Sequence, residues 1–172
     1  ERAGDGLEPR HRDVEVRVRR HRERARDRRR GHHQLVRVAA AGTPLLAQLH
    51  ALVQTPQGAV EVIAIHPMPP MNLAWQRTRN QTLAALRPRG NAPALVIGDF
   101  NATPWSNASP LLMQGGWRWF GGLQPTWPHG VWGIPIDAVW GHGPWAVTGH
   151  EVGPPIGSDH WPLRVGLRLT AS

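Results

Sequence analysis

Apolar and polar residues follow two different periods between residue 34 and the carboxyl end of the chain. Residues 60–66 (VEVIAIH) are almost entirely apolar and mostly β-branched, which predicts a strand buried on both faces. Over residues 72–86, apolar positions are separated by Gln and Arg and followed by Pro88, which predicts a helix. Further strands are expected at 92–99, 136–140, 145–152 and 163–169, with a short helical segment near 110–114. This order of strand, helix and strand predicts a layered α/β fold.

Residues 1–33 have a different texture and are predicted to be an Arg-rich disordered arm, with the folded part at 34–172. Residues 1–31 hold twelve Arg and seven acidic residues but few large apolar side chains, so this segment cannot bury enough surface to fold alone. Three interpretations are open: a basic arm that binds nucleic acid, a solvated tail without function, and a stretch translated out of frame.

Composition narrows the possible chemistry. The chain carries a net charge of +8, and its twenty basic residues are all Arg. Most of this excess lies in the arm, so the charge says little about the folded part. The absence of Cys excludes disulfides, thiolate metal sites and a cysteine nucleophile. We expect neither a transmembrane segment nor a signal peptide in this chain, and no obligate protein partner is evident.

Only five acidic residues follow residue 31, and three of them end or flank predicted strands within polar motifs. Asp99 and Asn101 stand two residues apart in VIGDFNA, so that strand alternation would place them on one side. Asp137 follows Ile136 in PIDAV, and Asp159 precedes His160 in GSDHWPL. Carboxylates, an amide and an imidazole suit a hard cation and the hydrolysis of a phosphate ester. Taken singly, each Asp is more often an Asx turn or a helix cap.

The four segments AIHPMPP, GDFNATPWS, PIDAV and GSDHWPL, in this order, resemble the carboxyl-terminal half of the endonuclease/exonuclease/phosphatase superfamily, which includes deoxyribonuclease I. The resemblance covers roughly residues 35–169. It implies a partial four-layer α/β sandwich, in which two packed mixed sheets are flanked by helices and the amino-terminal half is missing. It also implies a hydrolase of phosphodiester or phosphomonoester bonds that uses Mg²⁺ or Mn²⁺.

The resemblance further implies a role for each motif residue. Asp99 would orient or deprotonate the attacking water and join Asp159 in holding the metal ion, while Asn101 would hold a phosphate oxygen or that water. His160 would contact the scissile phosphate, with Asp137 accepting its other ring N–H.

His66, in the HPMPP segment, would protonate the leaving group. A His beside Pro67 is otherwise more often structural, so this assignment rests on the resemblance alone.

The resemblance begins abruptly near Leu35, which favours the out-of-frame interpretation of the arm. A complete domain would add an upstream Asn motif and the Glu that is the principal metal ligand, and neither motif is present. Three functions are therefore weighed: a metal-dependent phosphoesterase, a catalytically impaired fragment or split half, and a nucleic-acid binding protein acting through the arm. The substrate, which could be a nucleic acid, a phospholipid head group or an inositol phosphate, is left open, as is the location, although relatives are often membrane-anchored in bacteria.

Overall fold

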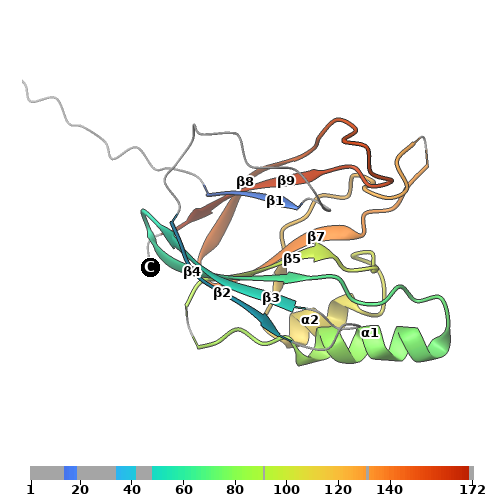
Figure 1. Ribbon diagram of the computed structural model, residues 1–172, viewed down its shortest axis with the longest axis horizontal. Helices are drawn as coiled ribbons and strands as arrows, with labels where there is room; N and C mark the ends of the chain where they lie inside the picture. Colours follow the sequence, from blue (N-terminus) through green and yellow to red (C-terminus); the bar gives the residue numbers. More distant parts are fainter. Residues whose placement is uncertain (1–13, 19–33, 42–47, 91, 131, 171–172) are drawn as a thin grey trace, which may run out of the picture.

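Two β-sheets pack face to face, and two helices cover the outer face of the larger sheet (Figure 1). The computed structural model describes residues 14–18, 34–41, 48–90, 92–130 and 132–170. The predicted α/β class with two packed sheets is confirmed. Among the described residues the layers are helices, large sheet and small sheet, and no helix covers the small sheet.

The larger sheet has six strands in the order β2-β3-β4-β5-β7-β6. β4 and β5 are parallel, while every other neighbouring pair in this sheet is antiparallel. The helix α1 (Leu73–Ala85) therefore forms the crossover that a parallel pair requires. The strand bounds are β2 Gln34–Ala41, β3 Gln48–Thr55, β4 Gly58–Ile65, β5 Ala94–Asp99, β6 Arg118–Trp119 and β7 Asp137–His142.

The smaller sheet has three antiparallel strands in the order β1-β9-β8. They are β1 Val14–Val18, β8 Trp145–Val152 and β9 Leu163–Leu169. β1 lies within the segment predicted to be an arm and pairs along its whole length with β9. The rest of residues 1–33 lies outside the described residues, so the predicted domain boundary stays a prediction.

Two apolar clusters fill the two sides of the larger sheet. Successive residues of β5 alternate between them: Val96 belongs to the cluster beneath the helices, and Leu95 to the cluster between the sheets. β7 does the same with Trp140 and Val139. Both strands are consequently buried on both faces.

The helices begin and end where local chemistry dictates. α1 (Leu73–Ala85) begins after Asn72, whose side-chain oxygen accepts the Trp75 N–H at 2.9 Å. Pro88 follows its end. α2 (Ser109–Gln114) has Pro110 in its first turn, where a missing N–H is harmless. The predicted elements from residue 60 onward are thus confirmed. None of the described helices is long and apolar enough to cross a membrane.

Candidate active site

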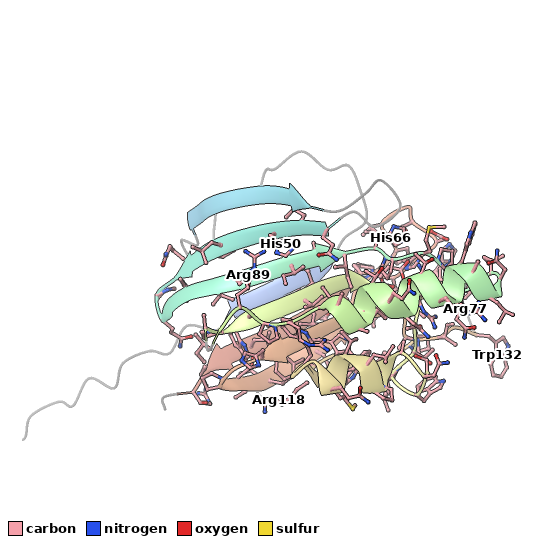
Figure 2. All side chains as sticks on the ribbon, turned by 90° about the horizontal axis from the view of Figure 1, so that it is seen from below. His50, His66, Arg77, Arg89, Arg118 and Trp132 are labelled. Atoms are coloured by element: carbon pink, nitrogen blue, oxygen red, sulfur yellow. The ribbon has the colours of Figure 1, made fainter. Side chains whose placement is uncertain are left out.

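Three neighbouring strands of the larger sheet bring polar residues to one edge. The parallel strands β4 and β5 both end there, so His66, directly after β4, lies beside Asp99, the last residue of β5. The antiparallel strand β7 begins at the same edge, where Asp137 is paired with Asp99. Figure 2 shows His66 at this end of the molecule.

Close packing of the backbones of β4 and β5 holds this edge together. Gly98 adopts a φ of +141°, and a Cβ at this position would overlap the carbonyl oxygen of Ile65 and stand 3.0 Å from its carbonyl carbon. Only glycine fits such a conformation and spacing. Because Gly98 precedes Asp99 and Ile65 precedes His66, this contact sets the separation of the two polar side chains.

Asp99 is the centre of the site. Its carboxylate is almost fully buried, and its Oδ2 lies 3.4 Å from Nε2 of His66 and 3.9 Å from Nε2 of His160. Its Oδ1 accepts the backbone N–H of Asn101 at 2.8 Å. His66 keeps 55% of its side chain exposed, whereas only 8% of the His160 side chain is exposed. The His66 imidazole therefore faces the solvent, whereas the His160 imidazole is buried.

His160 is oriented by Asp137. Its Nδ1 lies 2.7 Å from Oδ2 of Asp137, and both side chains are buried. Burial raises the pKa of the Asp137 carboxyl, and the hydrogen bond and charge of His160 partly offset this rise. Asp137 therefore holds the ring through Nδ1 and directs its Nε2 toward Asp99.

Thr126 supports this pair. Its hydroxyl oxygen accepts the backbone N–H groups of Ile136 and Asp137, each at 3.1 Å, and its backbone carbonyl accepts the N–H of Trp161. One buried Thr thus ties the start of β7 to the segment that carries His160. Thr126 was not predicted as a site residue, because its role depends on contacts between segments that are far apart in the chain.

Asn101 reaches the site by a turn. β5 ends at Asp99, so strand alternation does not place Asn101, contrary to the expectation from spacing. It adopts a left-handed φ of 48°, and its side-chain amide donates to the carbonyl of Pro67 at 2.9 Å. Asn tolerates this conformation better than most residues. The amide therefore connects the loop after β5 to the loop that begins with His66.

Asp159 stands at the exposed rim. Its Oδ2 accepts the indole N–H of Trp127 at 3.0 Å, and the Trp127 ring lies 6.2 Å from the His160 ring. The two remaining acidic residues of the predicted folded part lie elsewhere. Oε1 of Glu61 lies 3.5 Å from Nδ1 of His50, and Glu151 forms an ion pair with Arg164.

The predicted divalent metal ion has only a partial donor set in the described part of the chain. No group of three or more His, Asp or Glu side chains suited to a metal ion is found there. Asp99 and Asp159 are the predicted ligands, but the oxygens of Asp99 face two imidazoles and a backbone N–H. These residues by themselves do not fit a complete metal site.

The buried arrangement is suited to proton transfer. Asp99 lies between an exposed and a buried imidazole, and the buried imidazole is held by a second carboxylate. Such a set provides a base and an acid within a few ångströms of each other. The structure brings together five predicted site residues, namely His66, Asp99, Asn101, Asp137 and His160, while Asp159 lies at the rim through Trp127. Their catalytic roles stay predictions.

A family model described as the endonuclease/exonuclease/phosphatase family matches residues 7–160. No curated protein matches this sequence.

Several solved structures share the fold. An endonuclease/exonuclease/phosphatase from Beutenbergia cavernae is 20% identical, with a TM-score of 0.62 over 80% of this chain and 46% of that one. A family protein from Bacteroides thetaiotaomicron is 15% identical, with a TM-score of 0.65 over 80% of this chain and 64% of that one. A mannosyl-6-phosphatase from the same species is 15% identical, with a TM-score of 0.60 over 78% of this chain and 67% of that one. This chain thus spans about half to two thirds of their length.

Proposed function

Since this chain belongs to the endonuclease/exonuclease/phosphatase family, we propose that it hydrolyses phosphate esters at the edge formed by β4, β5 and β7. The observation that carries the proposal is the linked set His66, Asp99, His160 and Asp137. A buried carboxylate between two imidazoles is costly to maintain, and such groups concentrate at functional sites.

The geometry suggests a different role in catalysis for each of these residues. Asp99 is the candidate base for the attacking water, since its Oδ2 is the atom shared by both imidazoles. His160 presents Nε2 next to it and, once protonated, donates a hydrogen bond to the phosphate, while Asp137 prevents the ring from rotating. His66 is the exposed imidazole, so it is the candidate acid for the leaving group.

The family resemblance implies that Asn101 holds a phosphate oxygen. In this structure its side-chain amide donates to the backbone carbonyl of Pro67. An amide has two N–H donors, so the second one remains available for a substrate oxygen. The exposed rim formed by Trp127 and Asp159 would face the part of the substrate beyond the phosphate.

The predicted Mg²⁺ or Mn²⁺ stays in the proposal as a cofactor, although the described residues supply only part of its donor set. A hard cation would neutralise the charge that develops on the phosphate. Asp99 and Asp159 are the two carboxylates proposed to contact it. The proton-transfer and hydrogen-bonding roles proposed for Asp99, His160 and His66 do not involve the metal ion.

The proposal is tested with bis(p-nitrophenyl) phosphate as a diester and p-nitrophenyl phosphate as a monoester, each with and without Mg²⁺ or Mn²⁺. We expect the wild-type chain to release p-nitrophenol, and Asp99→Ala and His160→Ala each to abolish the release. His150→Ala on β8 is the control and should leave the rate unchanged, because this His lies outside the linked set.

The outcomes separate the alternatives. A folded chain without activity on either ester supports the impaired-fragment reading, and activity restored by a separately expressed upstream half identifies a split enzyme. Full activity in His160→Ala removes this residue from the catalytic set. The third reading, nucleic-acid binding through residues 1–33, predicts binding that weakens steeply with salt and is lost when the segment is deleted.

A further inference from the structure

Arg79 on α1 is a buried cation close to the site. Only 3% of this residue is exposed, and burial lowers the pKa of its guanidinium. Its Nη1 donates to the backbone carbonyl of Asn101 at 2.6 Å, and its Nε and Nη2 donate to the side-chain oxygen of the neighbouring Asn80 at 3.2 and 3.0 Å. Among the described residues, these acceptors are all neutral.

A purely structural role explains this arrangement poorly. Burying a charge without a carboxylate partner is unfavourable, and a Gln or Met would pack against the loop after β5 without that penalty. A charged donor does have one advantage, because its hydrogen bonds are shorter and roughly twice as strong as those between neutral groups. The strong bond is directed at a single atom, the carbonyl oxygen of Asn101.

Asn101 is the residue at which a strong clamp is most useful. Its left-handed φ of 48° still costs some free energy, although Asn tolerates this conformation better than most residues, so outside contacts help to hold the turn. Its N–H is bound to Asp99 and its side-chain amide to the carbonyl of Pro67. Arg79 therefore anchors a chain of contacts that extends from α1, through the loop after Asp99, to the loop after His66.

We propose that Arg79 is a positioning residue for phosphate-ester hydrolysis, which holds the Asn101 turn and through it the spacing of Asp99 and the His66 loop. This inference rests on the proposed function of the same edge. Arg79 is not expected to touch the substrate, so it should act on the rate of the chemical step more than on substrate binding.

The kinetic test compares Arg79→Gln and Arg79→Lys with Arg77→Gln. Arg77 lies on the same helix but is exposed (Figure 2), so it serves as a matched control. We expect Arg79→Gln to lower kcat about 10- to 100-fold, as is typical when a group supporting a reactive residue is removed, with little change in KM. Arg79→Lys, which keeps the charge without the planar fork, should recover part of this loss. Arg77→Gln should match the wild type.

A second measurement does not depend on activity. Amide hydrogen exchange of the peptide containing Asn101 should become faster in Arg79→Gln, since the N–H bound to Asp99 loses its support, while the strands keep their protection. Arg77→Gln should leave this exchange unchanged. An inactive wild-type chain with faster local exchange in Arg79→Gln would overturn the proposed function but not the clamp.

Three results would overturn the inference itself. One is unchanged kcat and exchange in Arg79→Gln. Another is a general rise of exchange throughout the sheet, which would make Arg79 a support of the whole fold. If Arg79→Gln does not fold, the third overturning result is a kcat and a local exchange in Arg79→Lys equal to those of the wild type, because a Lys without the planar fork should recover only part of the clamp.

Discussion

Replacing Gly98 by Ala should damage stability and activity together, because this glycine sets the distance between β4 and β5 at the catalytic edge. The added Cβ would overlap the carbonyl oxygen of Ile65 and stand 3.0 and 3.3 Å from its carbonyl carbon and nitrogen. All three atoms belong to the backbone, so a side-chain rotation cannot relieve the overlap.

Two costs contribute to the expected loss. Placing an L-residue at a φ of +141° is unfavourable by about 1–3 kcal/mol. Forcing the strands apart adds about 1–3 kcal/mol, the usual range for overpacking. Together these reach roughly 2–6 kcal/mol, against a total of about 5–15 kcal/mol for a typical domain. A shift of about 1 Å between His66 and Asp99 would further lower the rate on the order of 10²-fold.

The variant Gly58→Ala separates the free-energy cost of the positive φ from the cost of the backbone overlap. Gly58 also has a positive φ, +122°, but nothing lies within 4 Å of its added Cβ. Urea titration of both variants should therefore show a small loss for Gly58→Ala and a clearly larger one for Gly98→Ala. p-Nitrophenol release, measured at a temperature where both are folded, should fall only in Gly98→Ala. Equal losses of stability, or an unchanged rate in Gly98→Ala, would refute the idea that this close approach builds the site.

Four further predictions concern the site itself. Burial raises the pKa of the Asp137 carboxyl. The stability that this group contributes is therefore present below its unfolded-state pKa and is lost as the pH rises through the raised folded-state pKa. Urea titrations should show that the stability advantage of the wild type over Asp137→Asn shrinks as the pH rises. Asp137→Asn should also lower kcat about 10²- to 10⁴-fold in p-nitrophenol assays, because it no longer fixes His160 as a carboxylate does. Thr126→Val should cost about 1–3 kcal/mol for each buried N–H left without an acceptor, and Thr126→Ser should restore most of the loss, as read from urea midpoints. EDTA should stop hydrolysis and Mg²⁺ or Mn²⁺ should restore it, whereas a full rate in EDTA would remove the metal ion from the proposal.

The sequence predicted the central elements well because local pattern and tertiary environment agree there. The apolar run of β5 is buried on both faces, and Pro88 follows the observed end of α1. The convergence of Asp99, Asp137 and His160 was also expected, because the resemblance assigns these residues to one site.

The missed features depend on distant contacts. β2 and β3 were not assigned, because the residues from 38 to 53 mix apolar and polar positions without a clear period. Arg79 looks like any solvated Arg of an amphipathic helix, and its burial follows only from packing beneath the Asn101 loop. Strand alternation failed for Asn101, because the strand ends two residues before it.

The pairing of β1 with β9 bears on the order in which this chain can fold. Val14 lies opposite Leu167, so the smaller sheet joins segments that are far apart in the sequence. The strands of the larger sheet precede β8 and β9 in the chain and can pair before them, but Val60, Leu95 and Val139 then lack their partners from β9. Non-local pairing of this kind slows folding. Until the smaller sheet has formed, the apolar face of the larger sheet that it covers is exposed and prone to aggregation. A nascent chain paused before residue 163 should therefore depend on chaperones more than a chain extended through β9 does.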